Sequence, residues 1–184
     1  MDRKEFFTAS VKGTLGCCAL ALFGESAPAQ TQAEKPPEKD PEKEFTKNWM
    51  EDLFDSMYKE LDEPTRVKVM AGCGRGCFRR FQFKQDIAKQ GTGSVDKLLE
   101  AYKKNFEVWR DGDLVHVRYG AVSKLCYCPA ARYHPTRPND MHCECTRATH
   151  QTVFETALGR PIKMEIVESL RRGGQTCHFV AHVA

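Results

Sequence analysis

Seven of the nine cysteines in this 184-residue chain lie between residues 73 and 177, and their number and spacing limit how the chain can be cross-linked. Because seven is odd, complete disulfide pairing would leave one thiol over. In two pairs, Cys126/Cys128 and Cys143/Cys145, a single residue separates the cysteines, and a disulfide ring that small is strained. Each pair can instead point two sulfur atoms at one ion. The pattern therefore favours a metal site.

The histidines support the same interpretation. All six follow residue 115, and His134, His142 and His150 lie within or beside the segment 126–145. Thiolate and imidazole ligands together suit Zn²⁺, whereas four sulfurs suit either zinc or an iron–sulfur cluster. We expect zinc, with an iron–sulfur cluster as the less favoured alternative. The candidate ligands are Cys126, Cys128, Cys143, Cys145 and Cys177. Five candidates exceed the four positions of tetrahedral zinc, so at least one has another role.

Disulfide bonds remain the alternative for an exported domain, which would then be a structural protein without a cofactor. Cys73 and Cys77 are four residues apart on a predicted helix, where a buried free cysteine is an ordinary core residue. Their flanking glycines would let a substrate or cluster approach, and Arg75, Arg79 and Arg80 would favour a reactive thiolate. These two cysteines therefore form a candidate redox or second site.

The N-terminus predicts export. A basic start is followed by a short apolar stretch over 15–23, which cannot span a bilayer as a permanent helix. Ala27-Pro28-Ala29 then offers a signal-peptidase site that would leave Gln30 as the first mature residue. We expect a signal peptide over 1–29 and a periplasmic or otherwise extracytoplasmic protein, which leaves no membrane attachment after cleavage.

The segment Arg3-Lys4-Glu5-Phe6-Phe7 resembles a twin-arginine translocation signal in which lysine replaces the second arginine. That resemblance implies export of an already folded domain. A lipid anchor at Cys17 or Cys18 is the minor alternative, because Thr14 stands where a lipoprotein signal has a large aliphatic residue.

Composition divides the mature chain into a linker and one domain. Residues 30–44 contain no large apolar side chain and are predicted to be a disordered linker. Residues 45–184 are a common size for a single cysteine-rich domain. The net charge of +3 is too small to require nucleic acid or an anionic membrane, so a small molecule is the partner we expect.

Apolar periodicity predicts an α+β fold. Steps of three and four residues indicate helices beginning near Trp49, Thr65, Ser94 and Cys145, the last of which ends before Gly159. Period-two patterns indicate hairpins turning at 111–112 and 173–174, with the third strand reaching Ser169 or Leu170. We expect a four-stranded antiparallel sheet of two hairpins with about four helices on one face.

Two residues of the last predicted helix are candidates for proton transfer. His150 lies on the inward stripe, where a hydrogen-bonded core histidine is the simplest interpretation and a general base the alternative. If the protein is a metal-assisted hydrolase of a small cyclic amide-like substrate, His150 or Glu155 would move the protons. His178 and His182 should face away from the inward residues of the last strand.

The C-terminal part also resembles known domains. The run Phe154–Ile162 and the segment Gly173-Gly174-Gln175-Thr176-Cys177 resemble the end of the bacteriochlorophyll vinyl-reductase-type domain and of related sensor domains of aromatic-responsive regulators, over roughly residues 140–184. This resemblance implies that Cys143 and Cys177 bind one zinc ion and that Ser169 stands where those domains often have a further cysteine. Cys126, Cys128 or Cys145 would then complete the coordination.

A second resemblance covers most of the mature chain. The same ending, with Cys73-Gly74-Arg75-Gly76-Cys77 and Leu125-Cys126-Tyr127-Cys128-Pro129, is similar to cysteine-rich proteins related to 2-amino-thiazoline-4-carboxylate hydrolases. It implies hydrolysis of a small thiazoline-type substrate.

Overall fold

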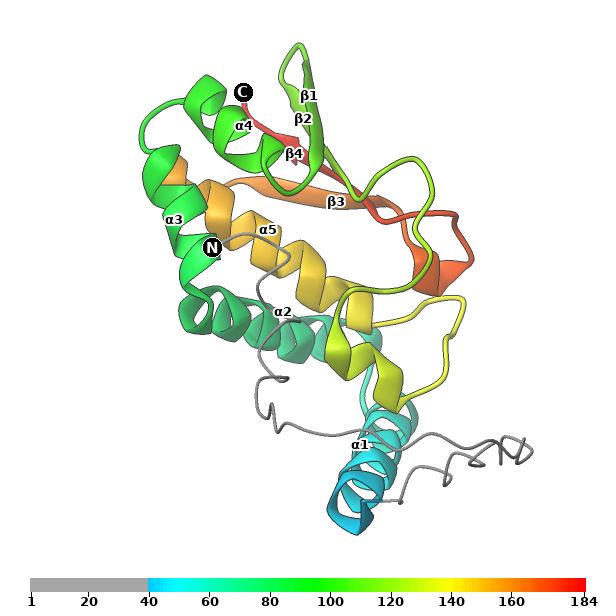
Figure 1. Cartoon of the computed structure of the whole chain (residues 1–184). Coiled ribbons are helices and arrows are strands. Elements are labelled where there is room, and N and C mark those ends of the chain that lie inside the picture. Colours follow the sequence, from blue (N-terminus) through cyan, green and yellow to red (C-terminus); the bar gives the residue numbers. More distant parts are fainter. Residues whose placement is uncertain (1–39) are drawn as a thin grey trace, which may run out of the picture. The chain divides into compact units, whose positions relative to one another are not determined.

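Residues 40–184 are described by a computed structural model, so the predicted signal peptide and most of the predicted linker lie outside the described range. This part of the chain contains five α-helices, two 3₁₀ turns and four strands (Figure 1). In chain order they are α1 (Pro41–Glu60), α2 (Glu63–Arg80), α3 (Gln82–Gln90), α4 (Val95–Lys103), β1 (Glu107–Asp111), β2 (Leu114–Arg118), η2 (Pro129–Tyr133), α5 (His142–Leu158), β3 (Lys163–Glu168), η3 (Leu170–Arg172) and β4 (His178–His182).

Side-chain caps set the starts of three helices. The carboxylate of Asp40 accepts from Glu42 N, that of Asp62 from Thr65 N at 2.8 Å, and the hydroxyl of Ser94 from Lys97 N at 3.4 Å. The predicted cap at Ser94 is confirmed. The Asp40 cap and the proline that follows it start α1 at Pro41, so the last four residues of the predicted linker, 41–44, are helical.

The sheet has the predicted architecture. Its strand order is β1-β2-β4-β3 and every neighbouring pair is antiparallel, which confirms the α+β fold with two hairpins. One face presents Val115, Val117, Phe179 and Ala181 to a core completed by residues of α3, α4 and α5. The third strand is shorter than predicted, because Ser169 leaves it and caps η3 through Arg171 N.

Glycine explains the close approach of α2 and α5, which lie side by side (Figure 1). A Cβ built on Gly74 would lie 2.3 Å from the carbonyl oxygen of Cys145 and 2.9 Å from Ala148 Cβ, so no larger residue fits. The Thr149 hydroxyl donates to the Gly74 carbonyl at 3.1 Å across the same contact. This contact fixes which residues of the two helices become neighbours.

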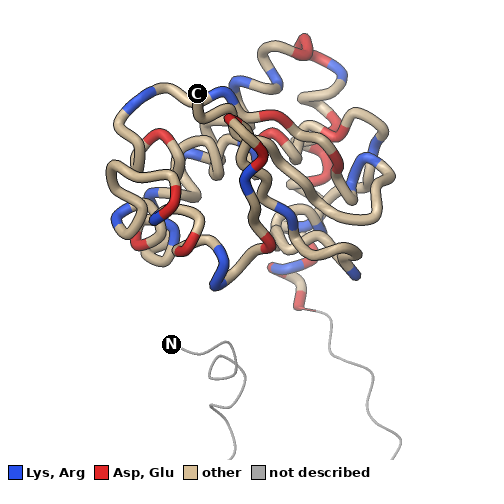
Figure 2. Tube along the Cα trace, turned by 90° about the horizontal axis from the view of Figure 1, so that it is seen from above, with Lys and Arg blue, Asp and Glu red and all other residues tan. Residues whose placement is uncertain are grey.

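Two further observations concern the distribution of charge and the apolar character of the helices in the described part. Lysine and arginine alternate with aspartate and glutamate along the trace (Figure 2). Among residues 40–184, none of the helices has the length and apolar character that crossing a bilayer requires.

We expect Gly74→Ala to reduce the free energy of unfolding by about 1–3 kcal/mol, because the added methyl group must push the two helices apart. Gly72→Ala on the same helix is the matched control. Its Cβ would meet nothing closer than Arg75 Nη2 at 3.8 Å, so the higher helix propensity of alanine should leave stability unchanged or raise it. Urea unfolding of both variants under reducing conditions measures the difference, and equal stabilities would contradict this account of the contact.

Candidate functional site

The helix α5 separates two cysteines that the sequence pattern had paired. It begins at His142, three residues before the predicted start at Cys145, so Cys143 and Cys145 are both helical. Residues two apart on an α-helix are rotated by about 200° and do not face each other. Cys143 accordingly lies beside Ser169, and Cys145 faces the cysteines of α2. The helical conformation of both residues argues against this Cys-x-Cys pair pointing at one ion.

Three thiols from three segments gather instead on the other side of α5. They are Cys77 of α2, Cys128 of the loop before η2, and Cys145 of α5, and each is an electrostatic neighbour of the other two. Cys126 adjoins this group through Cys128 and is also an electrostatic neighbour of Cys177. We call these four residues the thiol cluster. Sequence analysis had assigned Cys77 to a separate site, since nothing in the local pattern indicates that Gly74 brings α2 against α5.

Burial keeps the deeper thiols of this region protonated at neutral pH. It raises the pKa of Cys145 to about 12, with neighbouring thiols adding to the shift, and it also raises the pKa of Cys128. On the other side of α5, burial raises the pKa of Cys143 to about 11. Removing these protons requires a compensating positive charge or several hydrogen-bond donors.

The sulfur of Cys128 is surrounded by donors. His142 Nε2 lies 3.0 Å from Cys128 Sγ, and the backbone N–H groups of Ala130 and Ala131, in the first turn of η2, lie near this sulfur, with Ala131 N donating to the Cys128 carbonyl at 3.1 Å. Hydrogen bonds of this kind favour the charged form and hence lower the pKa against the effect of burial. Such donors around a sulfur are typical of the outer shell of a metal thiolate.

The direction of the histidine hydrogen bond follows from Arg171, whose guanidinium can only donate. Arg171 Nη2 lies 2.9 Å from His134 Nδ1, which therefore accepts and leaves the ring proton on Nε2. Pro135 O, 3.2 Å from the same nitrogen, is satisfied by Arg171 at 2.9 Å. His134 Nε2 donates in turn to His142 Nδ1 at 3.2 Å, so His142 Nε2–H donates to Cys128. A general base would need a free lone pair on Nε2 to accept the proton of Cys128. His142 carries a proton on this nitrogen and therefore cannot act as that base.

A buried ion pair anchors this chain of hydrogen bonds, which runs from Arg171 through His134 and His142 to Cys128. Asp140 is fully buried and accepts from Arg171 Nε at 2.7 Å, and Arg171 itself is 6% exposed. Burial and the charge of Arg171 lower the pKa of His134, and burial, His134 and Arg171 lower the pKa of His142 to about 4. Both rings are therefore neutral at physiological pH, as this chain of hydrogen bonds requires.

A second pair of thiols lies around Ser169. Its hydroxyl is 2.8 Å from Cys143 Sγ and also lies near Cys177, and the two thiols are electrostatic neighbours. The fold therefore brings Cys143 and Cys177 together, from α5 and from the start of β4. The serine occupies the position between them.

A lysine that sequence analysis missed lies beside Cys77. Lys84 Nζ is 2.8 Å from Cys77 Sγ and reaches it from α3, a short helix whose burial of Ile87 and Ala88 gave only a weak sequence signal. Arg79 and Arg80, which were expected to influence this thiol, have exposed side chains at the end of α2. Cys73, one turn before Cys77, is exposed and is also an electrostatic neighbour of Cys145.

All seven cysteines of the described part are free thiols. Within residues 40–184 no three histidine, cysteine, aspartate or glutamate side chains are close enough together to hold one metal ion. The sulfur atoms of the thiol cluster are thus neighbours without being a finished coordination sphere.

The two predicted proton-transfer residues, His150 and Glu155, have different surroundings and different hydrogen-bond partners. His150 is buried between two phenols, with Tyr102 Oη 3.2 Å from Nδ1 and Tyr119 Oη 2.9 Å from Nε2. Burial, aided by Lys84, lowers the pKa of His150 to about 3. Glu155 accepts from Gln151 Nε2 and from Ile162 N, and so holds the turn after α5.

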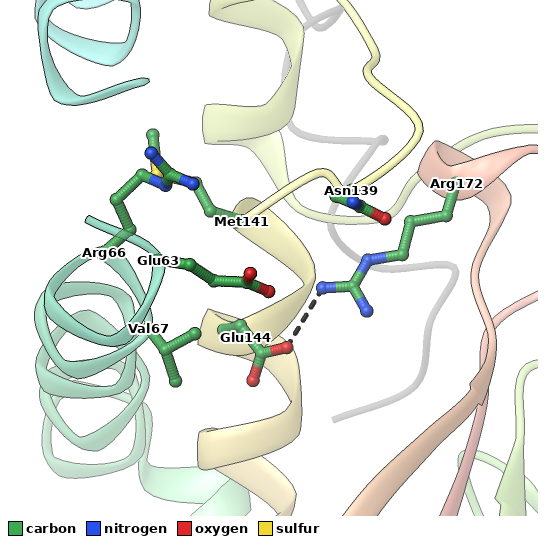
Figure 3. A pocket seen from close by; sticks show the side chains of 7 residues that line it. All are labelled: Glu63, Arg66, Val67, Asn139, Met141, Glu144 and Arg172. Carbon is green, nitrogen blue, oxygen red and sulfur yellow. Dashed lines mark hydrogen bonds and ion pairs between the residues drawn. The ribbon is translucent and has the colours of Figure 1, made fainter. Parts of the chain in front are cut away.

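A small hollow opens on another side of α5, between the start of α2 and η3 (Figure 3). Glu144 and Arg172 face each other across it and form a 3.0 Å ion pair. Its volume of about 50 Å³ suits a few water molecules, not an organic substrate. The other residues that line it are Glu63, Arg66, Val67, Asn139 and Met141.

We expect acid to destabilise the fold through His150. An unfolded histidine titrates near pH 6.5, whereas folded His150 has a pKa of about 3, so between these values the unfolded state binds the extra proton and stability falls as pH falls. His142 acts in the same direction. His150→Gln should reduce the loss of unfolding free energy between pH 7 and pH 5 by about 2 kcal/mol. Urea unfolding at the two pH values measures this, and an unchanged loss would exclude His150 as its source.

We also expect Cys143 and Cys145 to react slowly with iodoacetamide at pH 8, because both are buried thiols whose pKa lies well above that pH. Exposed Cys73 should be modified first. Peptide mass spectrometry of timed samples gives the order of modification. The same reaction in urea, where all cysteines become accessible, is the control, and early modification of Cys145 in the folded chain would refute the assignment.

Comparisons with protein-family models, with curated proteins and with solved structures found no match for this chain.

Proposed function

We propose that this protein is an exported domain that binds zinc through the thiolates of Cys77, Cys126, Cys128 and Cys145. The observation that carries the proposal is that Cys77, Cys128 and Cys145, which come from α2, a loop and α5 and share no local sequence pattern, lie within electrostatic range of one another. Four sulfur ligands would make a closed site with a structural role. Relative to the ligands expected from sequence, Cys77 replaces Cys143 and Cys177.

The surroundings of the thiol cluster support this ligand set. Cys77 has the ammonium group of Lys84 beside it, and Cys128 faces the Nε2 atom of His142 at 3.0 Å, with the backbone N–H groups of Ala130 and Ala131 nearby. These groups would share the negative charge of a zinc–thiolate site and fix the direction of its sulfur atoms. The raised pKa of Cys145 is compatible, because zinc replaces the thiol proton on binding.

Zinc binding by these residues requires the loop to move. Residues 119–128 contain no helix or strand, and Ser123 ties this loop to the segment before β4 through Gln175 O and the Thr176 hydroxyl. Such a segment can shift at small cost compared with the apparent binding free energy of structural zinc, about 10–16 kcal/mol in small zinc domains. Cys126 and Cys128 both lie on it, so one displacement would bring two sulfurs toward α2 and α5.

Elemental analysis of the full chain, purified from the cytoplasm without chelators, tests the proposal. We expect about one zinc per chain and loss of free-thiol reactivity at the thiol cluster. Cys77→Ser, Cys128→Ser and Cys145→Ser should each abolish stoichiometric zinc, whereas Cys143→Ser, beside Ser169 on the other side of α5, should retain it. Absence of metal with few free thiols would instead support a disulfide-bonded protein, and visible absorbance with bound iron would indicate an iron–sulfur cluster.

His142 provides a separate test of the donor arrangement. His142→Phe removes the N–H that faces Cys128 while keeping a ring of similar size, and it should weaken zinc binding by about 10- to 100-fold. Competition with a chromophoric chelator measures this affinity. Equal affinities for the variant and the parent would show that the His142 N–H does not support a zinc ligand.

A further inference from the structure

The outer face of the sheet carries a second group of side chains that the thiol cluster does not involve. Strand pairing places Trp109 opposite His116 and Arg118 opposite His178. His116 Nδ1 lies 2.9 Å from His178 Nε2, so the two imidazoles face each other with nitrogen atoms in contact. Cys177 precedes His178, but side chains alternate along a strand, so the two project toward opposite faces.

We propose that His116 Nδ1 and His178 Nε2 form a binding site for a divalent transition-metal ion that accepts two imidazoles at right angles, such as Ni²⁺ or Cu²⁺. Metal–nitrogen bonds of about 2.0–2.1 Å place two ligands at right angles about 2.8–3.0 Å apart, and tetrahedral ligands about 3.3–3.4 Å apart. The observed 2.9 Å, which is also the length of the hydrogen bond between the two rings, is closer to the first geometry than to the second.

The two rings are held in this arrangement before any metal arrives. The indole of Trp109 stacks on His116 with 4.5 Å between ring centroids and 5° between planes. His116 and His178 stand on adjacent hydrogen-bonded strands, β2 and β4, so their backbones are fixed. Preorganisation of this kind reduces the ordering cost of binding. In the free protein one ring donates to the other, and metal binding requires that this ring move its proton to its outer nitrogen and that both rings turn so that their lone pairs converge on the ion.

The positive charge of Arg118 near the histidine pair is offset by a neighbouring carboxylate. Arg118 lies over the indole of Trp109, but Glu107 engages it through two hydrogen bonds of 2.6 and 2.9 Å and offsets its charge. Glu168 is also near His178, and its carboxylate accepts from the backbone of Gln175. Neither carboxylate joins the two histidines as a third ligand within the described residues, so water or an exogenous ligand would fill the remaining positions.

The tryptophan provides the measurement. The chain has two tryptophans, so Trp49→Phe leaves Trp109 as its only indole, stacked on a proposed ligand. Nickel sulfate should quench the fluorescence of this full-length variant in a saturable manner, and isothermal titration calorimetry should report the same affinity. Nickel avoids the thiol oxidation that Cu²⁺ would cause.

Substitutions of the ligands decide the outcome. His116→Gln and His178→Gln should each weaken the affinity for nickel by at least about 10-fold, and His182→Gln, on the same strand, should leave it unchanged. Nickel binding that survives both ligand substitutions but disappears in Cys128→Ser would belong to the thiol cluster and overturn the proposal, as would absence of saturable quenching. Zinc content is measured in parallel, so failure of either site is visible without the other.

Discussion

The contact between α2 and α5 at Gly74 determines most of the arrangement around the cysteines. Because the backbone of α2 touches α5 at Cys145 and Thr149, the residue one turn further along α2, Cys77, comes to lie near Cys145. Any side chain at residue 74 would collide with the backbone of α5 and force the two helices apart. The thiol cluster is thus a consequence of backbone packing, and Gly74 of α2 has a structural explanation.

A second determinant is the buried pair of Arg171 and Asp140. Burying both charges is costly unless they are paired and hydrogen-bonded. Here Arg171 also donates to the backbone of Ala131 and Pro135, and therefore fixes the loop around η2 to the segment before β4. The same guanidinium sets the tautomers of His134 and His142, so an interaction that stabilises the loop also determines which atom faces the sulfur of Cys128.

The two proposed metal sites differ in how far their ligands are preorganised for binding. The histidine pair stands on paired strands and has a spacing close to that of two ligands at right angles. The thiol cluster depends on a loop whose sulfur atoms must still approach those of the helices. This difference follows from the supporting elements, because a sheet fixes side chains more tightly than an irregular segment does.

Local patterns in the sequence were sufficient for the sheet and for four of the helices. Alternation over 108–119 and 177–183 predicted strands that pair as expected, and Ser94 and Gly159 marked the helix ends at which they are found. The sequence alone therefore determined the fold class and the presence of an unusual set of thiols. It could not determine their grouping: the helical start at His142 turned Cys143 and Cys145 to opposite sides, and packing at Gly74 recruited Cys77. Those outcomes depend on contacts between residues far apart in the chain, which only the tertiary structure specifies.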